Sequence, residues 1–206
     1  VNVVVTDHHH MQSLHPPADA VFHTTAVSGA GVAYFFAQAL VAEMSQSPSH
    51  ERLVFLLRED YAALAAIGVI ADLIPFVGPA RSLARAGLGA LSRTRRVGLV
   101  ELMNGSGIER GSLVTAYHVG FVLGPRINAF GRIEHAMDSL RLLCTQSTTR
   151  AVELAKLAED VNSRRQILVQ KAVQDALGSV DSTSKIIIAQ SDRWEEGIIG
   201  LIASKL

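Results

Sequence analysis

The start of the chain places one carboxylate and three imidazoles directly after an apolar run. The first thirteen residues are VNVVVTDHHHMQS, so Asp7, His8, His9 and His10 stand together. In open α/β sheets, ligands bind beyond the carboxyl ends of the strands, which is where this group would lie. Imidazole with carboxylate suits Mn²⁺, Fe²⁺ or Zn²⁺ better than Ca²⁺. The pattern indicates a metal site with His8 as ligand, and a His-rich loop is the alternative; we expect His10 and His15 in a surface loop.

A second carboxylate stands in an apolar stretch, GVIADLIPFVG, which contains Asp72. Burying a carboxylate among apolar neighbours is costly unless it is paired, hydrogen-bonded or bound to a cation. We therefore expect Asp72 to be a metal ligand together with the histidines at the strand end. The alternative is an aspartate that caps a helix or turn before Pro75.

The segment GPRINAFGR, Gly124 to Arg132, concentrates hydrogen-bond donors between glycines and a proline. We expect it to be a loop. The guanidinium groups of Arg126 and Arg132 and the amide of Asn128 match phosphate oxygens, and the glycines allow backbone amides to approach an anion. Phosphate binding is the preferred interpretation, and a solvated connection is the alternative.

Two glycines near the end of the chain, Gly197 and Gly200 in WEEGIIGLIASKL, flank the start of an expected helix. Backbone amides left free at a helix start bind anions, so Gly197 is a candidate substrate contact. Close packing permitted by small residues explains the same pattern equally well.

The composition is that of an ordinary globular protein, with 49% hydrophobic and 18% charged residues among 206. The single cysteine, Cys144, excludes an internal disulfide, and no secretory signal is visible, so we expect a cytoplasmic protein. The apolar stretch Ala62 to Pro79 is interrupted by Asp72 and Pro75, which predicts a buried helix and no membrane span. Because the chain starts with Val1 and ends within an expected helix, we expect an internal fragment.

The formal net charge is zero, so the overall charge does not predict nucleic-acid binding. Residues 73 to 100 nevertheless contain no acidic residue, and they include five arginines: Arg81, Arg85, Arg93, Arg95 and Arg96. This stretch is either a solvated helix face or a surface that faces phosphates.

Strands alternate with helices in the pattern of the chain, which predicts an α/β protein. We expect a buried strand at Val1–Val5 and a strand at Lys185–Gln190. The expected helices are Ala30–Met44 with Ser28 as N-cap, Glu51–Ile74, Ala80–Arg93, Arg96–Met103, one ending near Leu123, Glu134–Cys144, Thr149–Leu177 and one starting at Gly197. We place a domain boundary at the turn Asn104 to Gly107.

Taken in order, TDHH, SGAGVAYFFAQAL, GVIADLIPFVG, GPRINAFGR and WEEGIIGLIASKL resemble the RecJ-type single-stranded-DNA-specific exonucleases of the DHH phosphoesterase superfamily. The resemblance implies the C-terminal part of a DHH-type parallel-sheet domain at residues 1–98 and a helical connector at 99–111. The N-terminal part of a DHHA1-type substrate-binding domain would follow at 112–206. An active site between the two domains is also implied.

The same resemblance implies a hydrolase that removes nucleotides from the 5′ end of single-stranded DNA in recombination and repair, with two Mn²⁺ or Mg²⁺ ions. His8 and Asp72 would be metal ligands, His9 would lie beside the scissile phosphate, and Asp7 would support them. Other repair or replication proteins would be further partners, and no association with a membrane is expected.

The substrate phosphates would be held by Arg126, Asn128 and Arg132, with Gly197 nearby. Family members carry further metal-binding aspartates before the DHH motif and often a histidine where this chain has Glu195. We therefore expect this chain to be inactive alone. Two alternatives stay open: a DHH phosphodiesterase acting on oligoribonucleotides or cyclic dinucleotides, and a non-catalytic relative in replication assemblies.

Overall fold

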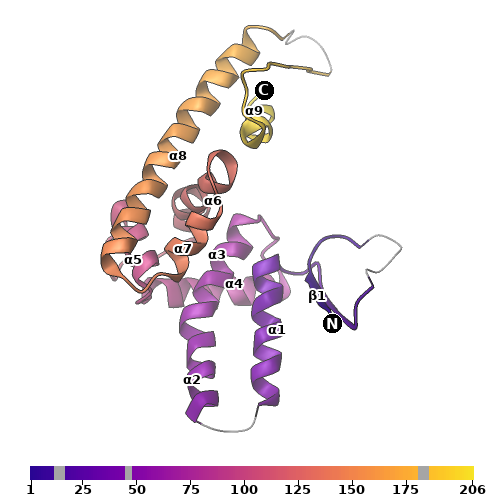
Figure 1. The fold of residues 1–206 in the computed structure, drawn as a ribbon, viewed down its shortest axis with the longest axis vertical. Coiled ribbons are helices and arrows are strands. Elements are labelled where there is room, and N and C mark those ends of the chain that lie inside the picture. Colours follow the sequence, from indigo (N-terminus) through magenta and orange to yellow (C-terminus); the bar gives the residue numbers. More distant parts are fainter. Residues whose placement is uncertain (12–16, 45–47, 181–185) are drawn as a thin grey trace. The chain divides into compact units, whose positions relative to one another are not determined.

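The computed structural model describes residues 1–11, 17–44, 48–180 and 186–206, and His15 lies outside these ranges. The described chain is α/β, mostly helical with a small parallel sheet (Figure 1). It divides into two compact units, residues 1–96 with 108–124, and residues 97–107 with 125–206. The predicted fold class is confirmed at this level.

The sheet of the first unit pairs β1 (Val4–Asp7) with β2 (Ala20–His23) in parallel, and Asp7 lies opposite His23. The strand expected at Val1–Val5 overlaps β1 only at Val4 and Val5, and its continuous burial was wrong. Val4 is 53% exposed, and exposure alternates along β1 because only one face of the strand is partly covered. The partner strand β2 was not predicted, since its four residues follow a loop without a strong apolar pattern.

The helices of the first unit agree with the sequence prediction to within a few residues. Ser28 caps α1 as predicted, with its Oγ accepting a hydrogen bond from the Gly31 amide at 3.3 Å. The second predicted helix is one run of three segments that ends three residues early, at Ala71. The bounds are α1 Gly29–Glu43, α2 Pro48–Leu56, the π-helical turn η1 Leu57–Tyr61, α3 Ala62–Ala71, α4 Gly78–Ser92 and the π-helical turn η2 His118–Leu123.

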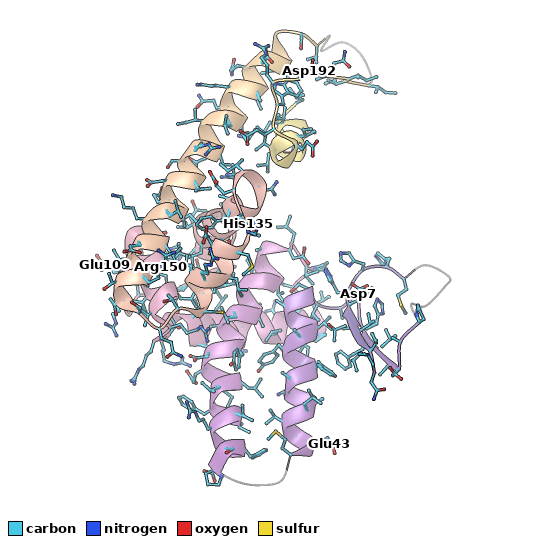
Figure 2. All side chains as sticks on the ribbon, viewed as in Figure 1. Asp7, Glu43, Glu109, His135, Arg150 and Asp192 are labelled. Carbon is cyan, nitrogen blue, oxygen red and sulfur yellow. The ribbon has the colours of Figure 1, made fainter. Side chains whose placement is uncertain are left out.

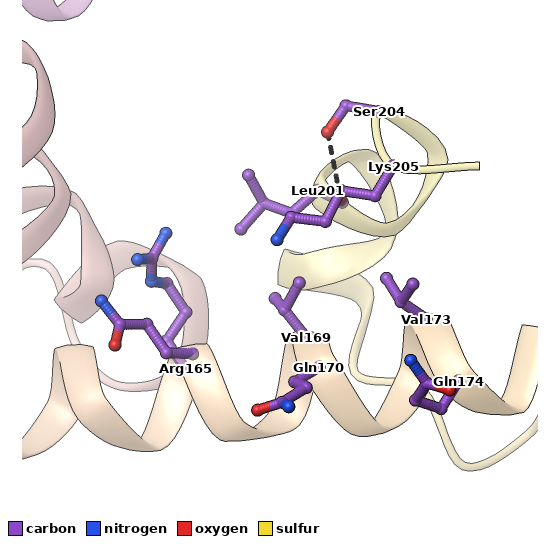
Figure 3. Close-up of a pocket in the computed structure, with 9 residues that line it drawn as sticks. Arg165, Val169, Gln170, Val173, Gln174, Leu201, Ser204 and Lys205 are labelled. Atoms are coloured by element: carbon purple, nitrogen blue, oxygen red, sulfur yellow. Dashed lines mark hydrogen bonds between the residues drawn. The ribbon is translucent and has the colours of Figure 1, made fainter.

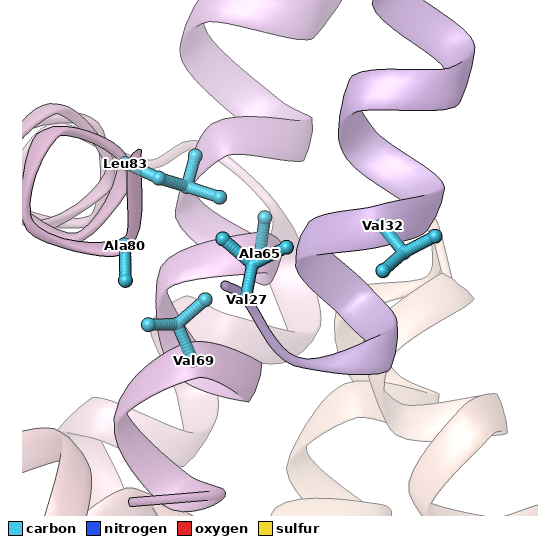
Figure 4. Packing of buried hydrophobic residues seen from close by; sticks show 6 residues of the cluster. All are labelled: Val27, Val32, Ala65, Val69, Ala80 and Leu83. Atoms are coloured by element: carbon cyan, nitrogen blue, oxygen red, sulfur yellow. The ribbon is translucent and has the colours of Figure 1, made fainter. Parts of the chain in front are cut away.

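Helix α3 forms the centre of this unit and is buried, as predicted. Figure 4 shows its Ala65 and Val69 facing Val27 and Val32 on one side and residues of α4 on the other. Among the described residues, no helix has both the length and the apolar character needed to cross a bilayer. The small side chains of α3 allow its neighbours to pack closely on it.

The second unit is built on the long helix α8, which was predicted almost to the residue. Buried residues of α8 pack against η3 and α9 in a second apolar core. The bounds in this unit are α5 Val97–Gly105, α6 Gly124–Ile133, α7 Met137–Cys144, α8 Thr148–Leu177, the 3-10 turn η3 Glu196–Ile198 and α9 Ile199–Ala203.

The segment GPRINAFGR is not a loop, contrary to the prediction. It forms α6 and follows η2 without a break, so the preceding helix does not end near Leu123. Pro125 is tolerated because it lies in the first turn of α6, directly after the π-helical turn. Ala129 and Phe130 are fully buried, which stabilises the helix through packing despite its two glycines.

The predicted strand at Lys185–Gln190 is also wrong for the residues that are described. Ile186 to Gln190 form no strand, and Lys185 lies outside the described residues. Ile186 and Ile188 are 77% and 84% exposed. A run of β-branched residues forms a strand only where a neighbouring strand offers its backbone groups, and β1 and β2 are the only strands that the described residues form.

Two glycines of α4 differ sharply in their surroundings. A Cβ at Gly87 would clash with the Ala62 carbonyl oxygen and the Ala66 Cβ of α3, whereas at Gly89 the nearest atom lies 3.6 Å away. We expect Gly87→Ala to lower the free energy of unfolding by about 2 kcal/mol or more through overpacking. Gly89→Ala is the matched control and should raise it by roughly 0.5–1 kcal/mol through helix propensity. Urea unfolding measures both, and equal effects would contradict the close packing of α4 on α3.

Candidate active site

His8 and Asp72 come together in the first unit, as the sequence predicted. His8 follows the end of β1, and its Nδ1 lies 3.7 Å from Asp72 Oδ2. Their side chains are 20% and 47% exposed, so the pair is open to solvent. Helix α1 approaches His8 closely, because a Cβ at Gly29 would contact the His8 ring at 3.4 Å. The first turn of α1 therefore supports the imidazole.

Asp72 is the C-cap of α3, the position given by the alternative interpretation, and the expectation that it is buried was wrong. The chain leaves the helix in a Schellman motif: the Leu73 amide donates to the Ile70 carbonyl at 3.2 Å and the Ile74 amide to the Val69 carbonyl at 3.3 Å. A helix C-terminus carries partial negative charge, which the Asp72 carboxylate increases. This position is electrostatically favourable for a cation.

Asp7 and His9 form a separate hydrogen-bonded pair beside His8. His9 donates from Nδ1 to Asp7 Oδ1 at 2.8 Å and from its backbone amide to Oδ2 at 3.2 Å. The side-chain hydrogen bond from His9 lowers the pKa of Asp7 below its usual value, although desolvation opposes it. Asp7 is thus kept ionised, and it orients the ring of His9, which lies tilted by 41° against the His8 ring with 4.3 Å between ring centroids.

His23 was missed by the sequence analysis, since no motif contains it. It ends β2 opposite Asp7, and its Nε2 donates to the His9 carbonyl oxygen at 2.7 Å. This bond holds the backbone of the DHH segment against the neighbouring strand. The missing signal was β2 itself, because only the strand pairing brings His23 to Asp7 and His9.

The residues present fit part of a metal site. Two ligands that each lie about 2.1 Å from one ion are separated by roughly 3–4 Å, which the 3.7 Å between His8 and Asp72 satisfies. Among the described residues, however, no group of three or more histidine, cysteine, aspartate or glutamate side chains is placed to hold an ion. His8 and Asp72 therefore supply two of the four to six ligands that such an ion takes.

The predicted phosphate-binding residues lie in the second unit, on α6. Arg126 Nε donates to Glu159 Oε2 at 2.6 Å, and Arg132 donates to the Gly197 carbonyl oxygen at 3.0 Å. Asn128 is exposed. Both guanidinium groups are thus fixed by contacts within this unit.

Gly197 packs directly on the backbone of α6. A Cβ at this position would clash with the Arg132 carbonyl oxygen, so only glycine allows η3 to lie here. Close packing, the alternative interpretation of Gly197, is therefore present. Glu195 lies 4.0 Å from Arg164.

Two of the five arginines in the acid-free stretch are paired within the first unit. Arg93 lies 3.2 Å from Glu59, and Arg96 lies 3.6 Å from Asp60. Arg81, Arg85 and Arg95 are exposed. The stretch therefore serves in part to hold α4 and the following turn against η1.

Comparison with known proteins gives a consistent result, although no protein-family model matches the chain. The single-stranded-DNA-specific exonuclease RecJ of Bacillus subtilis is 35% identical over 219 residues, which cover 100% of this chain and 26% of that protein. The crystal structure of RecJ from Thermus thermophilus in complex with Mn²⁺ matches 100% of this chain and 31% of that one, with a TM-score of 0.85 and 34% identity. The whole chain is homologous to RecJ.

A second crystal structure of Thermus thermophilus RecJ, in complex with Mg²⁺, covers 81% of this chain with a TM-score of 0.68 and 32% identity. The chain spans 26% of the Bacillus subtilis RecJ and 28–31% of the Thermus thermophilus RecJ in its two crystal structures. The resemblance to RecJ that the sequence motifs indicated is thus confirmed, and this chain corresponds to one segment of RecJ.

Leu73 directly follows Asp72 and has a left-handed backbone conformation, with φ of 56°. This conformation costs a residue with a Cβ about 1–2 kcal/mol, and glycine usually occupies it in a Schellman motif. We expect Leu73→Gly to raise the free energy of unfolding by about 1 kcal/mol, since the side chain is 86% exposed and loses little packing. Val77→Gly, at an exposed residue with φ of −123°, is the control and should not stabilise. Thermal unfolding of the two variants decides, and a stabilised Val77→Gly would contradict the argument.

Proposed function

We propose that this chain is part of a metal-dependent exonuclease that hydrolyses single-stranded DNA from its 5′ end in recombination and repair. The observation that carries the proposal is the 3.7 Å approach of His8 Nδ1 to Asp72 Oδ2, between a strand end and a helix end. The homology to RecJ supports the substrate and reaction, and it favours them over the oligoribonucleotide, cyclic-dinucleotide and non-catalytic alternatives. Cleavage from the 5′ end rests on the family resemblance alone.

We assign His8 and Asp72 as ligands of Mn²⁺ or Mg²⁺, with two ions as in the proposed family mechanism. A divalent cation supplies Lewis acidity, which lowers the pKa of water and neutralises charge on a phosphate. The complexes of RecJ with Mn²⁺ and Mg²⁺ support this choice of ions. The charge at the end of α3 favours a cation at the Asp72 carboxylate.

Asp7 and His9 complete the proposed catalytic group. Asp7 accepts two hydrogen bonds from His9, so it fixes the tautomer and the orientation of the imidazole. The His9 side chain is 78% exposed and thus accessible to a phosphodiester. With Nδ1 protonated toward Asp7, Nε2 is left to interact with the substrate. Figure 2 shows Asp7 at the strand end from which this group extends.

We propose that Arg126, Asn128, Arg132 and Gly197 bind substrate phosphates in the second unit. The forked guanidinium groups can each donate to phosphate oxygens while keeping their present partners. Glycine at position 197 fixes the distance between η3 and the Arg132 backbone.

For the domains, we propose residues 1–98 as part of a DHH domain, 99–111 as connector and 112–206 as part of a DHHA1 domain. Other repair or replication proteins are proposed partners. A cytoplasmic location is proposed from the single exposed thiol of Cys144, which suits a reducing compartment.

The test uses the complete product of the gene that encodes this chain. With Mn²⁺, it should release a labelled mononucleotide from a long single strand labelled at its 5′ end, and it should act poorly on a dinucleotide. Asp72→Ala and His8→Ala should each lower the rate by more than about 100-fold, because each removes a proposed ligand. His10→Ala is the control for His8, and this exposed residue should change the rate by less than about twofold.

Chelation of the metal should abolish cleavage and Mn²⁺ should restore it. Cleavage that persists in Asp72→Ala would refute the metal assignment. Binding of single strands without any cleavage would refute the enzyme and leave the homology to RecJ untouched.

A further inference from the structure

Helix α8 carries an inward stripe whose spacing alternates between four and three residues. Six of its eight members are alanine or valine, and the remaining two are adjacent in the stripe: Asn162 and Arg165. The members are Ala151, Ala155, Ala158, Asn162, Arg165, Val169, Ala172 and Ala176. A 4-3 spacing places all eight on one face of a helix. An amide and a guanidinium therefore stand where the pattern calls for core residues.

At each of these two positions, one polar atom is buried without a hydrogen-bond partner. Asn162 is only 2% exposed, and its Oδ1 has no hydrogen-bond partner. The Nε of Arg165 is also buried without a hydrogen-bond partner. Leaving a buried polar atom unpaired costs about 1–3 kcal/mol. Such atoms are rare in folded proteins, and each calls for a physical explanation. The stripe thus holds polar groups that do not contribute to stability.

Arg165 also differs from the other arginines of this unit. Each of the others has a described acceptor: Arg126, Arg132, Arg141, Arg150, Arg164 and Arg193. Within the described ranges, no carboxylate or carbonyl group pairs with Arg165. Burial lowers the pKa of its guanidinium, and the positive charges of Arg132 and Arg126 lower it further. The positive charges of these three arginines therefore act on one another, and Glu159 pairs with Arg126.

Arg165 borders a cavity of about 610 Å³ between α8 and α9 in the second unit. Figure 3 shows Val169 and Val173 pointing from α8 toward Leu201, with the Arg165 side chain at one end of this row. Gln166, Gln170 and Lys205 add hydrogen-bond donors to the lining. An anion that reaches Arg165 therefore finds donors and no described carboxylate among the lining residues.

We propose that Arg165 binds a phosphodiester of the single strand and completes an anion site with Arg126 and Arg132. This inference rests on the proposed function. A phosphate removes the electrostatic conflict among the three guanidinium groups and supplies acceptors that Arg165 lacks. The side chain is thus retained at a core position for binding, at the expense of stability.

The test measures stability and binding of the same variants. Arg165→Leu replaces one of the two polar members of the stripe with an apolar residue, so the melting temperature should rise by about 2–4 °C. Its affinity for an oligo(dT) of about 12 nucleotides should fall at least tenfold, and the slope of log K against log salt should shrink by roughly 0.7. Arg164→Ala is the matched control, since Arg164 is next to Arg165 in the chain but its guanidinium is exposed and paired with Glu134. It should change affinity by less than about twofold.

Arg165→Lys keeps the charge and loses the forked donors. It is the second variant to be measured, and it replaces Arg165→Leu in the test if the leucine variant does not fold. Its affinity should fall severalfold while the salt slope stays unchanged. The proposal is overturned if either folded variant binds oligo(dT) as the unaltered chain does, or if Arg165→Leu lowers the melting temperature without affecting affinity. Absence of binding by both the chain and the complete gene product would overturn the proposed function as well. Normal cleavage with unaltered affinity in Arg165→Leu would refute only the role of Arg165.

Discussion

The first unit depends on the close approach of α1 and α4 to α3. A Cβ at Gly31 would lie 2.7 Å from the Val27 Cβ and 3.4 Å from Val69, and one at Gly68 would lie 2.5 Å from the Ala30 Cβ. Gly87 stands as close to α3 on the other side. Interiors are packed without free volume, so larger residues here would displace a helix. Because His8 rests on the start of α1 and Asp72 ends α3, the distance between the two depends directly on this packing.

In the second unit, the corresponding constraint is electrostatic. The positive charges of Arg126 and Arg132 on α6 act on the guanidinium of Arg165 on α8, and Glu159 pairs with Arg126. Glycine at position 197 adds a steric constraint, because it allows η3 to pack against the Arg132 backbone. Packing here brings like charges together, which is the opposite of what stability alone would favour.

The sequence predicted the long or strongly patterned elements and the pairing of His8 with Asp72. The 3.6-residue period of α8 and the Ser28 cap are local signals, and local signals suffice for such elements. The strand at Lys185–Gln190 and the missed β2 depend on strand partners, which local sequence does not specify. GPRINAFGR was misassigned because glycine and proline outweighed the burial of Ala129 and Phe130. Asp72 was placed correctly by its neighbours in sequence, but its exposure follows from the helix end, which the motif does not show.

Three departures from local preference coincide with the proposed sites. Asp72 adds negative charge to a helix C-terminus, Leu73 adopts a left-handed conformation, and Arg165 occupies a core position of a helix stripe. Each costs stability, and among the described residues the contact that could offset one of these costs is the 3.7 Å approach of His8 Nδ1 to the Asp72 carboxylate. A chain selected for stability alone would replace them with a cation, a glycine and a leucine. Their presence is most simply explained by ligands of opposite charge, a metal ion at Asp72 and a phosphate at Arg165, since binding these ligands turns both unfavourable charges into favourable ones.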